Sequence, residues 1–281
     1  MDAIPVYKTK WKWLILGLGL SFLYVPILSL VIYSFNANRL VTVWSGFSTQ
    51  WYGALFEDTL LMNGITLSLT IGFLSASAAV VLGTLAAFVM TRFKKFRGET
   101  SFAFMITAPL VMPEVITGLS LLLLFISLGQ VFDLFSQRGM LTIWIAHVTF
   151  CTAYVSVVVS SRLRELDKSI EEAAMDLGAT PFKVFFVITL PTILPALVAG
   201  WLLAFTLSLD DLVIASFVSG PSATTLPMVV FSSVRLGVSP KINALATLII
   251  AVVSVATFIA WWVMAKAEKR RMQELKTANG S

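Results

Sequence analysis

Three carboxylates lie inside long apolar stretches of the chain: Glu114, Asp210 and Asp211. A charged side chain costs at least about 2.5 to 3.5 kcal/mol at the centre of a membrane-spanning helix, so each carboxylate should face water or a partner group rather than lipid. No lysine or arginine lies deep in any of these stretches. Fixed acids without neighbouring cations favour passage of a cationic substrate. The alternative is that these acids bond to nearby backbone or to a partner subunit.

The residues around Glu114 predict how this acid is held. Pro109, Pro113 and Gly118 surround it, which is typical of a broken or loosened helix at a place where the backbone lines a cavity. In a straight helix that begins at residue 102, Glu114 would lie roughly 18 Å along the axis, near the midplane of a bilayer. The sequence therefore predicts an interrupted span with an acid at the interruption.

Asp210 and Asp211 are neighbours in a later apolar stretch. In a continuous helix from residue 196 they would lie roughly 21 to 22 Å along the axis, in the outer half of the span. Consecutive helical residues point about 100° apart, so we expect only one of the two to face a substrate pathway. The sequence leaves open which one does so.

Aromatic residues are a second set of candidates for contact with a cation. Tyr24, Trp44 and Trp51 could form part of the pathway, because a cation over an aromatic ring gains about 0.5 to 2 kcal/mol. The alternative is that they belong to the aromatic belt at a membrane interface. His147 is the single histidine, and a lone apolar-flanked histidine is typical of packing and hydrogen bonding. The sequence contains no cluster that predicts a metal site or a catalytic residue.

The composition indicates the class of protein that positions these residues. The chain has 281 residues, of which 58% are hydrophobic and 12% are charged, and its mean hydropathy is +0.89. Soluble domains have about twice this share of charged residues. The composition therefore excludes an ordinary soluble enzyme, a disordered protein and a disulfide scaffold, and it predicts a membrane protein that crosses the bilayer several times.

Six stretches are long and apolar enough to span a bilayer, which takes about 20 residues as a helix. Only helices or closed barrels satisfy the backbone in lipid, and these runs lack the alternation of barrel strands. We therefore predict an all-α integral membrane protein, with residues 1–281 forming a single transmembrane domain. Its six helices span about residues 14–35, 65–90, 102–128, 140–159, 196–218 and 242–265.

The distribution of positive charge predicts the orientation. The N-terminus, residues 92–97, residues 160–195 and the C-terminal tail carry sixteen of the twenty lysines and arginines. Positive residues collect on the cytoplasmic side, so both termini and the segment 160–195 are predicted to be cytoplasmic. The net charge of +5 thus reflects membrane topology and not nucleic-acid binding. The outer segment 219–243 is predicted to contain a short helix at 228–234. It gates the pathway, serves as a docking surface for a delivery protein, or is a passive loop, and the sequence leaves this open.

The cytoplasmic segment 160–195 contains the pattern of a short amphipathic helix. Ser169 and Glu172 have the spacing of a capping box, and Gly178 is placed to end the helix in a left-handed turn. Thr180 and Pro181 then predict a second helix that ends at Pro191. The apolar face of the first helix consists of Ile170, Ala173, Ala174 and Leu177. Its acidic face consists of Glu171, Glu172 and Asp176. A helix this short is marginal alone, so it either packs on its own bundle or docks on a partner.

A longer motif in this segment resembles a known family. Glu172-Ala173-Ala174, Gly178 and Ile188-Thr189-Leu190-Pro191 are similar at every fixed position to the EAA motif, E-A-A-x3-G-x9-I-x-L-P, of binding-protein-dependent ABC importer permeases. The resemblance implies a type I-like permease fold with a coupling helix between the fourth and fifth spans, which seats in a cleft of the ATP-binding subunit. The residues it places at this contact are Glu171, Glu172, Ala173, Ala174, Asp176, Leu177 and Gly178.

Further segments resemble the polyamine branch of that family: 33–36, 208–211 and 243–247. This resemblance implies import of a putrescine-like cation across a bacterial inner membrane, with spermidine or another small cation as the alternative. Glu114 stands where the family usually has aspartate. The implied partners are a second related permease, two ATP-binding subunits, a periplasmic polyamine-binding protein and membrane lipid.

The chain has no G-x-x-x-x-G-K-[ST] phosphate-binding loop, so we expect it to bind no cofactor. ATP and Mg²⁺ are expected on the separate ATPase. Two other functional classes are weaker. A gradient-driven secondary transporter leaves the short capped helix unexplained, and a membrane enzyme would need convergent catalytic groups.

Overall fold

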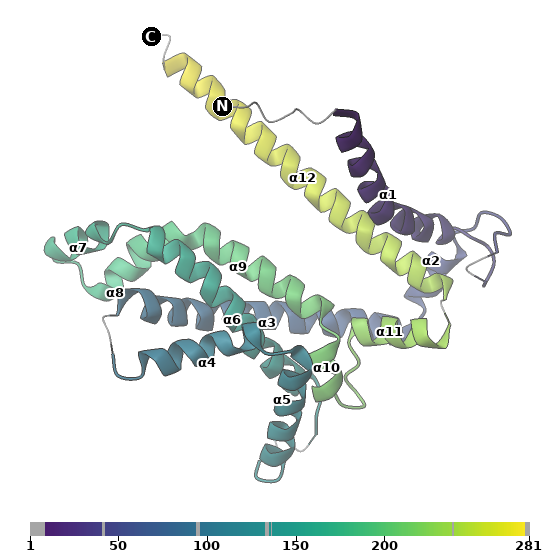
Figure 1. Ribbon diagram of the computed structural model, residues 1–281, viewed down its shortest axis with the longest axis horizontal. Helices are drawn as coiled ribbons and strands as arrows, with labels where there is room; N and C mark the ends of the chain where they lie inside the picture. The colour runs from purple at the N-terminus through teal and green to yellow at the C-terminus, as the bar shows by residue number, and fades with distance from the viewer. Residues whose placement is uncertain are drawn as a thin grey trace. The chain divides into compact units, whose positions relative to one another are not determined.

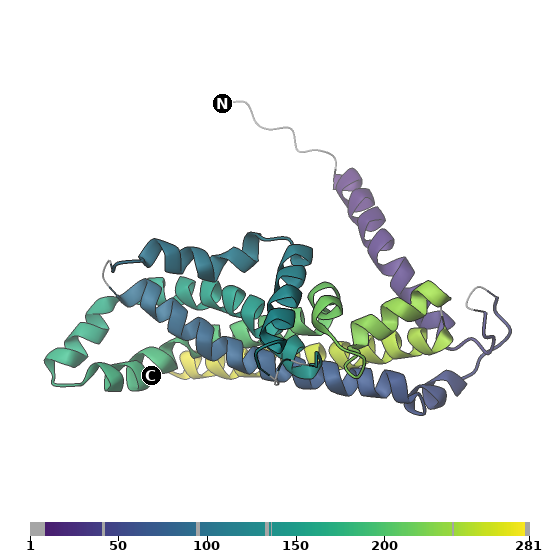
Figure 2. The ribbon, with the colours of Figure 1, turned by 90° about the horizontal axis from the view of Figure 1, so that it is seen from below.

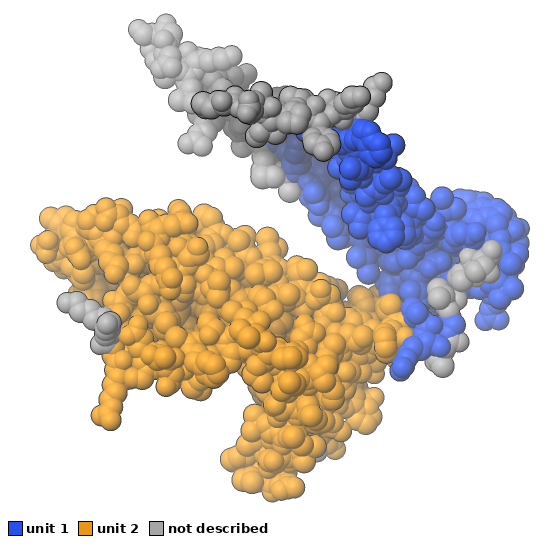
Figure 3. Space-filling model, viewed as in Figure 1, with its two compact units in different colours: residues 1–59, 232–281 blue, residues 60–231 orange. Residues whose placement is uncertain are grey.

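The computed structural model describes residues 9–40, 43–93, 96–132, 135, 137–237 and 239–278. The chain divides into two compact units, residues 1–59 with 232–281 and residues 60–231 (Figure 3). In the described ranges both units are helical, and one isolated antiparallel bridge joins Asn36 and Phe47. Each unit is described below by itself.

The unit formed by residues 1–59 and 232–281 contains α1, α2 and α12 (Figure 1). These helices are Thr9–Tyr33, Gln50–Phe56 and Pro240–Ala278. Both α1 and α2 pack against α12. Lys241 at the start of α12 lies 2.9 Å from the Asp58 carboxylate, which ties the two chain segments of this unit together.

The unit formed by residues 60–231 contains the candidate site, and its elements are seen from a second direction in Figure 2. Its helices are α3 (Thr59–Arg92), α4 (Glu99–Val111), α5 (Glu114–Gly129), α6 (Met140–Glu165), α7 (Lys168–Asp176), α8 (Pro181–Val184), α9 (Leu190–Asp210), α10 (Val213–Val218) and the first part of α11 (Leu226–Leu236). A π-helical segment, Phe185–Thr189, joins α8 to α9. The short helix predicted at 228–234 is thus confirmed as part of α11.

Small residues let the central helices of this unit pack closely. Gly200 of α9 faces Val155 of α6, and the Cys151 thiol donates to the Ala204 carbonyl at 3.4 Å. Val155 is also close to Gly83 of α3, since a Cβ added to Gly83 would lie only 2.8 Å from Val155 Cγ1. These contacts make α6 the centre of the unit's core.

Candidate spans agree in number with the predicted six when one bent pair is counted once. Among the residues that the structure describes, five helices are long and apolar enough to cross a membrane, and α4 with α5 forms a further pair bent by 116°. The break predicted near Glu114 is therefore confirmed. Because of this bend, the distance along a straight helix does not give the depth of Glu114.

Three predictions about helix ends were wrong. The stretch 196–218 is not one helix, because α9 ends at Asp210 and α10 begins at Val213. The helix that begins at Pro181 does not end at Pro191, since a π-helical turn continues it into α9. Proline has no N–H to donate to the preceding turn, and a π turn is one way for a helix to continue past such a position.

The third error concerns the start of α7. Asp167 and not Ser169 caps this helix, and its carboxylate accepts from the Ser169 backbone N–H at 2.9 Å. This bond lowers the pKa of the Asp167 carboxyl. Both residue types cap helices, and an ionised acceptor forms the stronger bond. The capping box predicted from Ser169 and Glu172 is therefore absent from α7.

Gly220 marks a place where two loops of this unit approach closely. The backbone carbonyl of Arg138 lies where a Cβ on Gly220 would stand, and the nearby Thr142 hydroxyl donates to the Val218 carbonyl at 2.7 Å. We expect Gly220→Ala to force these segments apart and to cost more than about 2 kcal/mol, the scale of overpacking. A lower unfolding temperature in detergent measures the effect. Gly53→Ala is the control, because nothing lies within 4 Å of its Cβ position; equal unfolding temperatures for both variants would contradict the prediction.

Candidate functional site

Two helix breaks line one cavity in the unit formed by residues 60–231. The first separates α4 from α5 at Met112 and Pro113, and the second separates α9 from α10 at Asp211 and Leu212. The cavity has a volume of about 290 Å³, and Glu114, Tyr154, Asp210 and Asp211 are among the residues that line it. The structure thus brings together all three carboxylates singled out in the sequence.

The second halves of the two broken spans pack on each other. Gly118 of α5 lies against Phe217 of α10, whose Cδ2 would be 2.8 Å from a Cβ at that position. The α10 helix also contacts α6. Because the short α10 lies between α5 and α6, it positions both breaks at the cavity.

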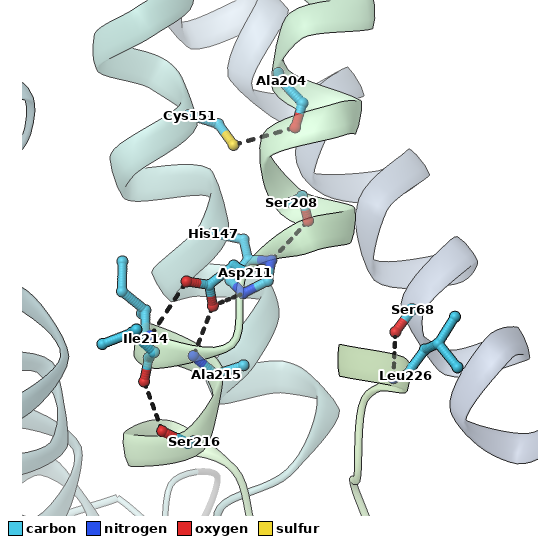
Figure 4. A network of polar contacts seen from close by, with 11 residues as sticks. Ser68, His147, Cys151, Ala204, Ser208, Asp211, Ile214, Ala215, Ser216 and Leu226 are labelled. Atoms are coloured by element: carbon cyan, nitrogen blue, oxygen red, sulfur yellow. Dashed lines mark hydrogen bonds and ion pairs between the residues drawn. The ribbon is translucent and has the colours of Figure 1, made fainter. Parts of the chain in front are cut away.

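Asp211 makes three hydrogen bonds within the protein (Figure 4). Its carboxylate accepts from the backbone N–H groups of Ile214 and Ala215, at 3.2 and 2.7 Å. It also lies 3.1 Å from His147 Nε2, and its side chain is 5% exposed. The first-turn N–H groups of a helix lack partners inside the helix, so Asp211 caps α10 and stabilises the break.

His147 joins Asp211 to α9. Its Nδ1 lies 2.6 Å from the Ser208 hydroxyl, and its side chain is 1% exposed. Each ring nitrogen of His147 thus has one hydrogen-bond partner, Asp211 at Nε2 and Ser208 at Nδ1. His147 is therefore a packing and hydrogen-bonding residue, as its sequence context predicted.

Asp210 differs from its neighbour. It is the last residue of α9, it is exposed, and it lines the cavity. Among the side chains that the structure describes, none pairs with its carboxylate. Of the two aspartates, Asp210 thus has the carboxylate that is available to a ligand.

Glu114 is the first residue of α5 and is also exposed to the cavity. An acid in the first turn is favoured by the partial positive charge of the helix N-terminus, by about 0.3 to 1 kcal/mol. Glu114 directly follows Pro113, so it lies at the break itself. Glu114 and Asp210 thus provide two carboxylates on one cavity.

Two aromatic residues of α6, Phe150 and Tyr154, also line the cavity. Their rings pack edge to face with centroids 6.5 Å apart, and Phe150 packs on His147 in the same way. Sequence reasoning missed both residues. The spacing of His147, Phe150 and Tyr154 along one face of a helix was the signal that could have identified them.

The aromatic candidates Tyr24, Trp44 and Trp51 belong to the other unit, where Trp44 and Trp51 contact residues of that unit. Trp51 Nε1 donates to the Asn36 carbonyl at 2.7 Å, and Trp44 packs edge to face on Tyr33. Tyr24 is 57% exposed on α1. The contacts of Trp51 and Trp44 stabilise the loop that follows α1.

The α7 helix and the turn after it present both apolar and acidic side chains to solvent. Gly178 has φ +88° and its N–H donates to the Met175 carbonyl, so the predicted left-handed turn is confirmed. Leu177 is 90% exposed and Phe182 is 79% exposed. We call this exposed region the α7 surface. Besides Leu177 and Phe182 it contains Ile170, Glu172, Ala173, Met175 and Asp176, whereas Ala174 is partly buried.

Glu171 does not belong to the α7 surface. Its carboxylate lies 2.8 Å from Arg92 Nε at the end of α3, and it accepts from the Thr189 hydroxyl at 2.9 Å.

Within the described ranges, no group of three or more His, Cys, Asp or Glu side chains is arranged to hold a metal ion.

A comparison with protein families supports the motif found in the sequence. The family described as "Binding-protein-dependent transport system inner membrane component" matches residues 79–273. The chain belongs to this family. The matched residues include α7, both helix breaks and the cavity between them. The chain is therefore a membrane permease component with no catalytic role of its own.

Two relatives of this permease are similar over most of its length. The putrescine transport system permease protein PotI of Escherichia coli K12 is 67% identical over 278 residues, which cover 99% of each chain. The spermidine/putrescine transport system permease protein PotC of the same organism is 41% identical over 246 residues, which cover 88% of this chain and 90% of PotC.

Solved structures share the fold of the permease. A chain of a bacterial ABC transporter that imports the acidic polysaccharide alginate has a TM-score of 0.70 and 17% identity, over 94% of this chain and 99% of that one. The same kind of transporter in complex with an alginate-bound periplasmic protein gives a TM-score of 0.66 and 16% identity, over 90% and 94% of the two chains. These identities show the fold alone.

Proposed function

We propose that this chain is the permease subunit through which an ATP-driven importer moves putrescine from periplasm to cytoplasm. The observation that carries the proposal is the cavity at the two helix breaks, where Glu114 and Asp210 present carboxylates and Tyr154 presents an aromatic ring. A dication that enters a bundle loses hydration, which fixed carboxylates replace in part. The ring adds a weaker attraction for an ammonium group.

Putrescine is favoured over spermidine by the similarity to PotI, which is greater than the similarity to PotC. In this proposal the chain pairs with a second related permease, binds two ATPase subunits and receives substrate from a periplasmic polyamine-binding protein. ATP and Mg²⁺ act on the ATPase subunits. Both chain termini and α7 lie on the cytoplasmic side, where the lysines and arginines concentrate.

The α7 helix is the coupling helix of this proposal. Its surface combines exposed apolar residues with the carboxylates of Glu172 and Asp176, and none of its residues is buried in the chain. A helix of this length gains its stability from packing on something else, which fits insertion into a cleft of an ATPase subunit. The segment 219–243, which includes α11, would contact the binding protein or gate the outer end of the pathway.

Uptake by the purified complex in proteoliposomes tests this function. The complex of both permeases and the ATPase is reconstituted, and labelled putrescine is added with its binding protein. We expect uptake that requires ATP and continues when ion gradients are collapsed with ionophores. Uptake that needs a gradient and not ATP would instead identify a secondary transporter, and a preference for labelled spermidine would favour the alternative substrate.

A further inference from the structure

Glu171 is distinguished from the other acids of α7 by its contacts. Its carboxylate is 2.8 Å from Arg92 Nε and 3.2 Å from a terminal nitrogen of the same guanidinium. The side chains of Arg92 and Glu171 are only 8% and 15% exposed. The terminal nitrogen donates a charge-assisted hydrogen bond, which is stronger than a neutral one, and the Nε contact is an ion pair. Glu171 is therefore held by the bundle and not presented to a partner.

The same carboxylate reaches a third element. It accepts from the hydroxyl of Thr189, at 2.9 Å, and Thr189 is 2% exposed. Thr189 is the last residue of the π-helical segment and directly precedes α9. Glu171 therefore joins α7 both to the end of α3 and to the beginning of α9.

This polar junction matters because α7 has little apolar packing on the bundle. None of its residues is buried. A cavity of about 470 Å³ is lined by Glu171, Glu172 and Met175 of α7 and by Phe88, Arg92 and Phe185 of the bundle, among others. With a cavity between α7 and these elements, the contacts of Glu171 fix where α7 sits.

The far end of α9 carries Asp210. A helix of 21 residues is about 31 Å long, and α9 packs along α6. The contact with Thr189 lies at the end of the π-helical segment that joins α9, so a displacement of α7 acts at the first turn of α9. Coupling between distant sites needs such contiguous packed elements.

We infer that Glu171 is a positioning residue that transmits displacement of α7 to α9, and thereby to Asp210 in the cavity. This inference rests on the proposed function, since it takes α7 to be the coupling helix. It assigns different roles to neighbouring acids: Glu172 contacts the ATPase subunit, and Glu171 passes the movement on within the permease.

The test measures how many putrescine molecules enter per ATP hydrolysed, in proteoliposomes that contain the complete complex. For Glu171→Gln we expect the ATPase subunits to remain bound and ATP hydrolysis to stay within about twofold of wild type. Transport per ATP should fall about tenfold, which corresponds to a coupling energy in the usual range for linked sites. Thr189→Val should lower the same ratio with the Arg92–Glu171 pair left intact.

The matched control is Glu165→Gln. Glu165 pairs with Arg162 at 2.9 Å on an exposed part of α6, where both side chains are more than 40% exposed. Exposed pairs contribute little, so transport per ATP should equal that of wild type. The charge exchange Arg92→Glu with Glu171→Arg should raise the ratio above that of either single variant.

Three outcomes would overturn the inference. The ATPase subunits could be lost from Glu171→Gln, which would make Glu171 a docking residue. Transport per ATP could remain at the wild-type value, or the charge exchange could give no recovery in an assembled complex. The proposed function fails separately, namely if the wild-type complex shows no ATP-driven uptake of a polyamine.

Discussion

Asp210→Asn is expected to reduce putrescine uptake at least tenfold while the complex still assembles, and Glu114→Gln is expected to do the same. Each change keeps nearly the same shape and removes one of the two available carboxylates of the cavity. An ammonium group 4 Å from a carboxylate gains about 4 kcal/mol at an effective dielectric constant of about 20. A net loss of about 1.4 kcal/mol in the rate-limiting step already slows transport tenfold. The measurement is uptake of labelled putrescine at matched amounts of complex.

Two controls separate charge from shape. Glu114→Asp keeps the charge and shortens the side chain, so it should retain most of the uptake that Glu114→Gln loses. Asp211→Asn removes a charge from the buried cap of α10. A buried bond left without its partner costs about 1 to 3 kcal/mol, so this variant should lower the amount of folded permease more than the uptake per complex. Wild-type uptake in both Asp210→Asn and Glu114→Gln would mean that these carboxylates are structural.

The two helix breaks show which parts of the site could be predicted from the sequence. Pro109 and Pro113 disrupt α4 locally, so the break near Glu114 was visible in the residues themselves. No proline or glycine marks the second break at Asp211 and Leu212. That break depends on a bond to His147, 64 residues away in the chain, and such a contact appears only when α6 and α9 are packed.

The same reason explains why the roles of Asp210 and Asp211 could not be separated. The apolar stretch predicted that they are consecutive residues of one helix. In the structure the helix ends at Asp210, and Asp211 has an extended backbone with ψ 120°. Tyr154 and Phe150 were missed because they are distant in sequence from every carboxylate of the cavity. The left-handed turn at Gly178 and the helix cap at Thr180, in contrast, could be predicted from the sequence, because both depend only on neighbouring backbone groups.

Gly178→Val is expected to leave the permease inserted in the membrane but without its ATPase subunits. Gly178 has φ +88°, and a left-handed conformation costs about 1 to 2 kcal/mol for a residue with a Cβ. A β-branched side chain makes this conformation a pronounced outlier. The turn holds Leu177 and Phe182 at the exposed end of the α7 surface, so a distorted turn would displace the apolar contacts proposed for docking.

Glu172→Lys should have the same effect for an electrostatic reason, since it reverses an exposed charge on that surface. Retention of the ATPase is measured by co-purification, and coupling by ATP hydrolysis that the loaded binding protein stimulates. Gly178→Asn and Glu172→Gln are the matched controls, because asparagine tolerates the left-handed region and glutamine keeps the shape of the side chain. Gly178→Asn should retain more ATPase than Gly178→Val, and Glu172→Gln should retain more than Glu172→Lys. The cavity lies at the other end of α9, so all four variants should leave the fold around Asp210 unchanged. A Gly178→Val complex with normal ATPase content and full uptake would refute the docking role of the α7 surface.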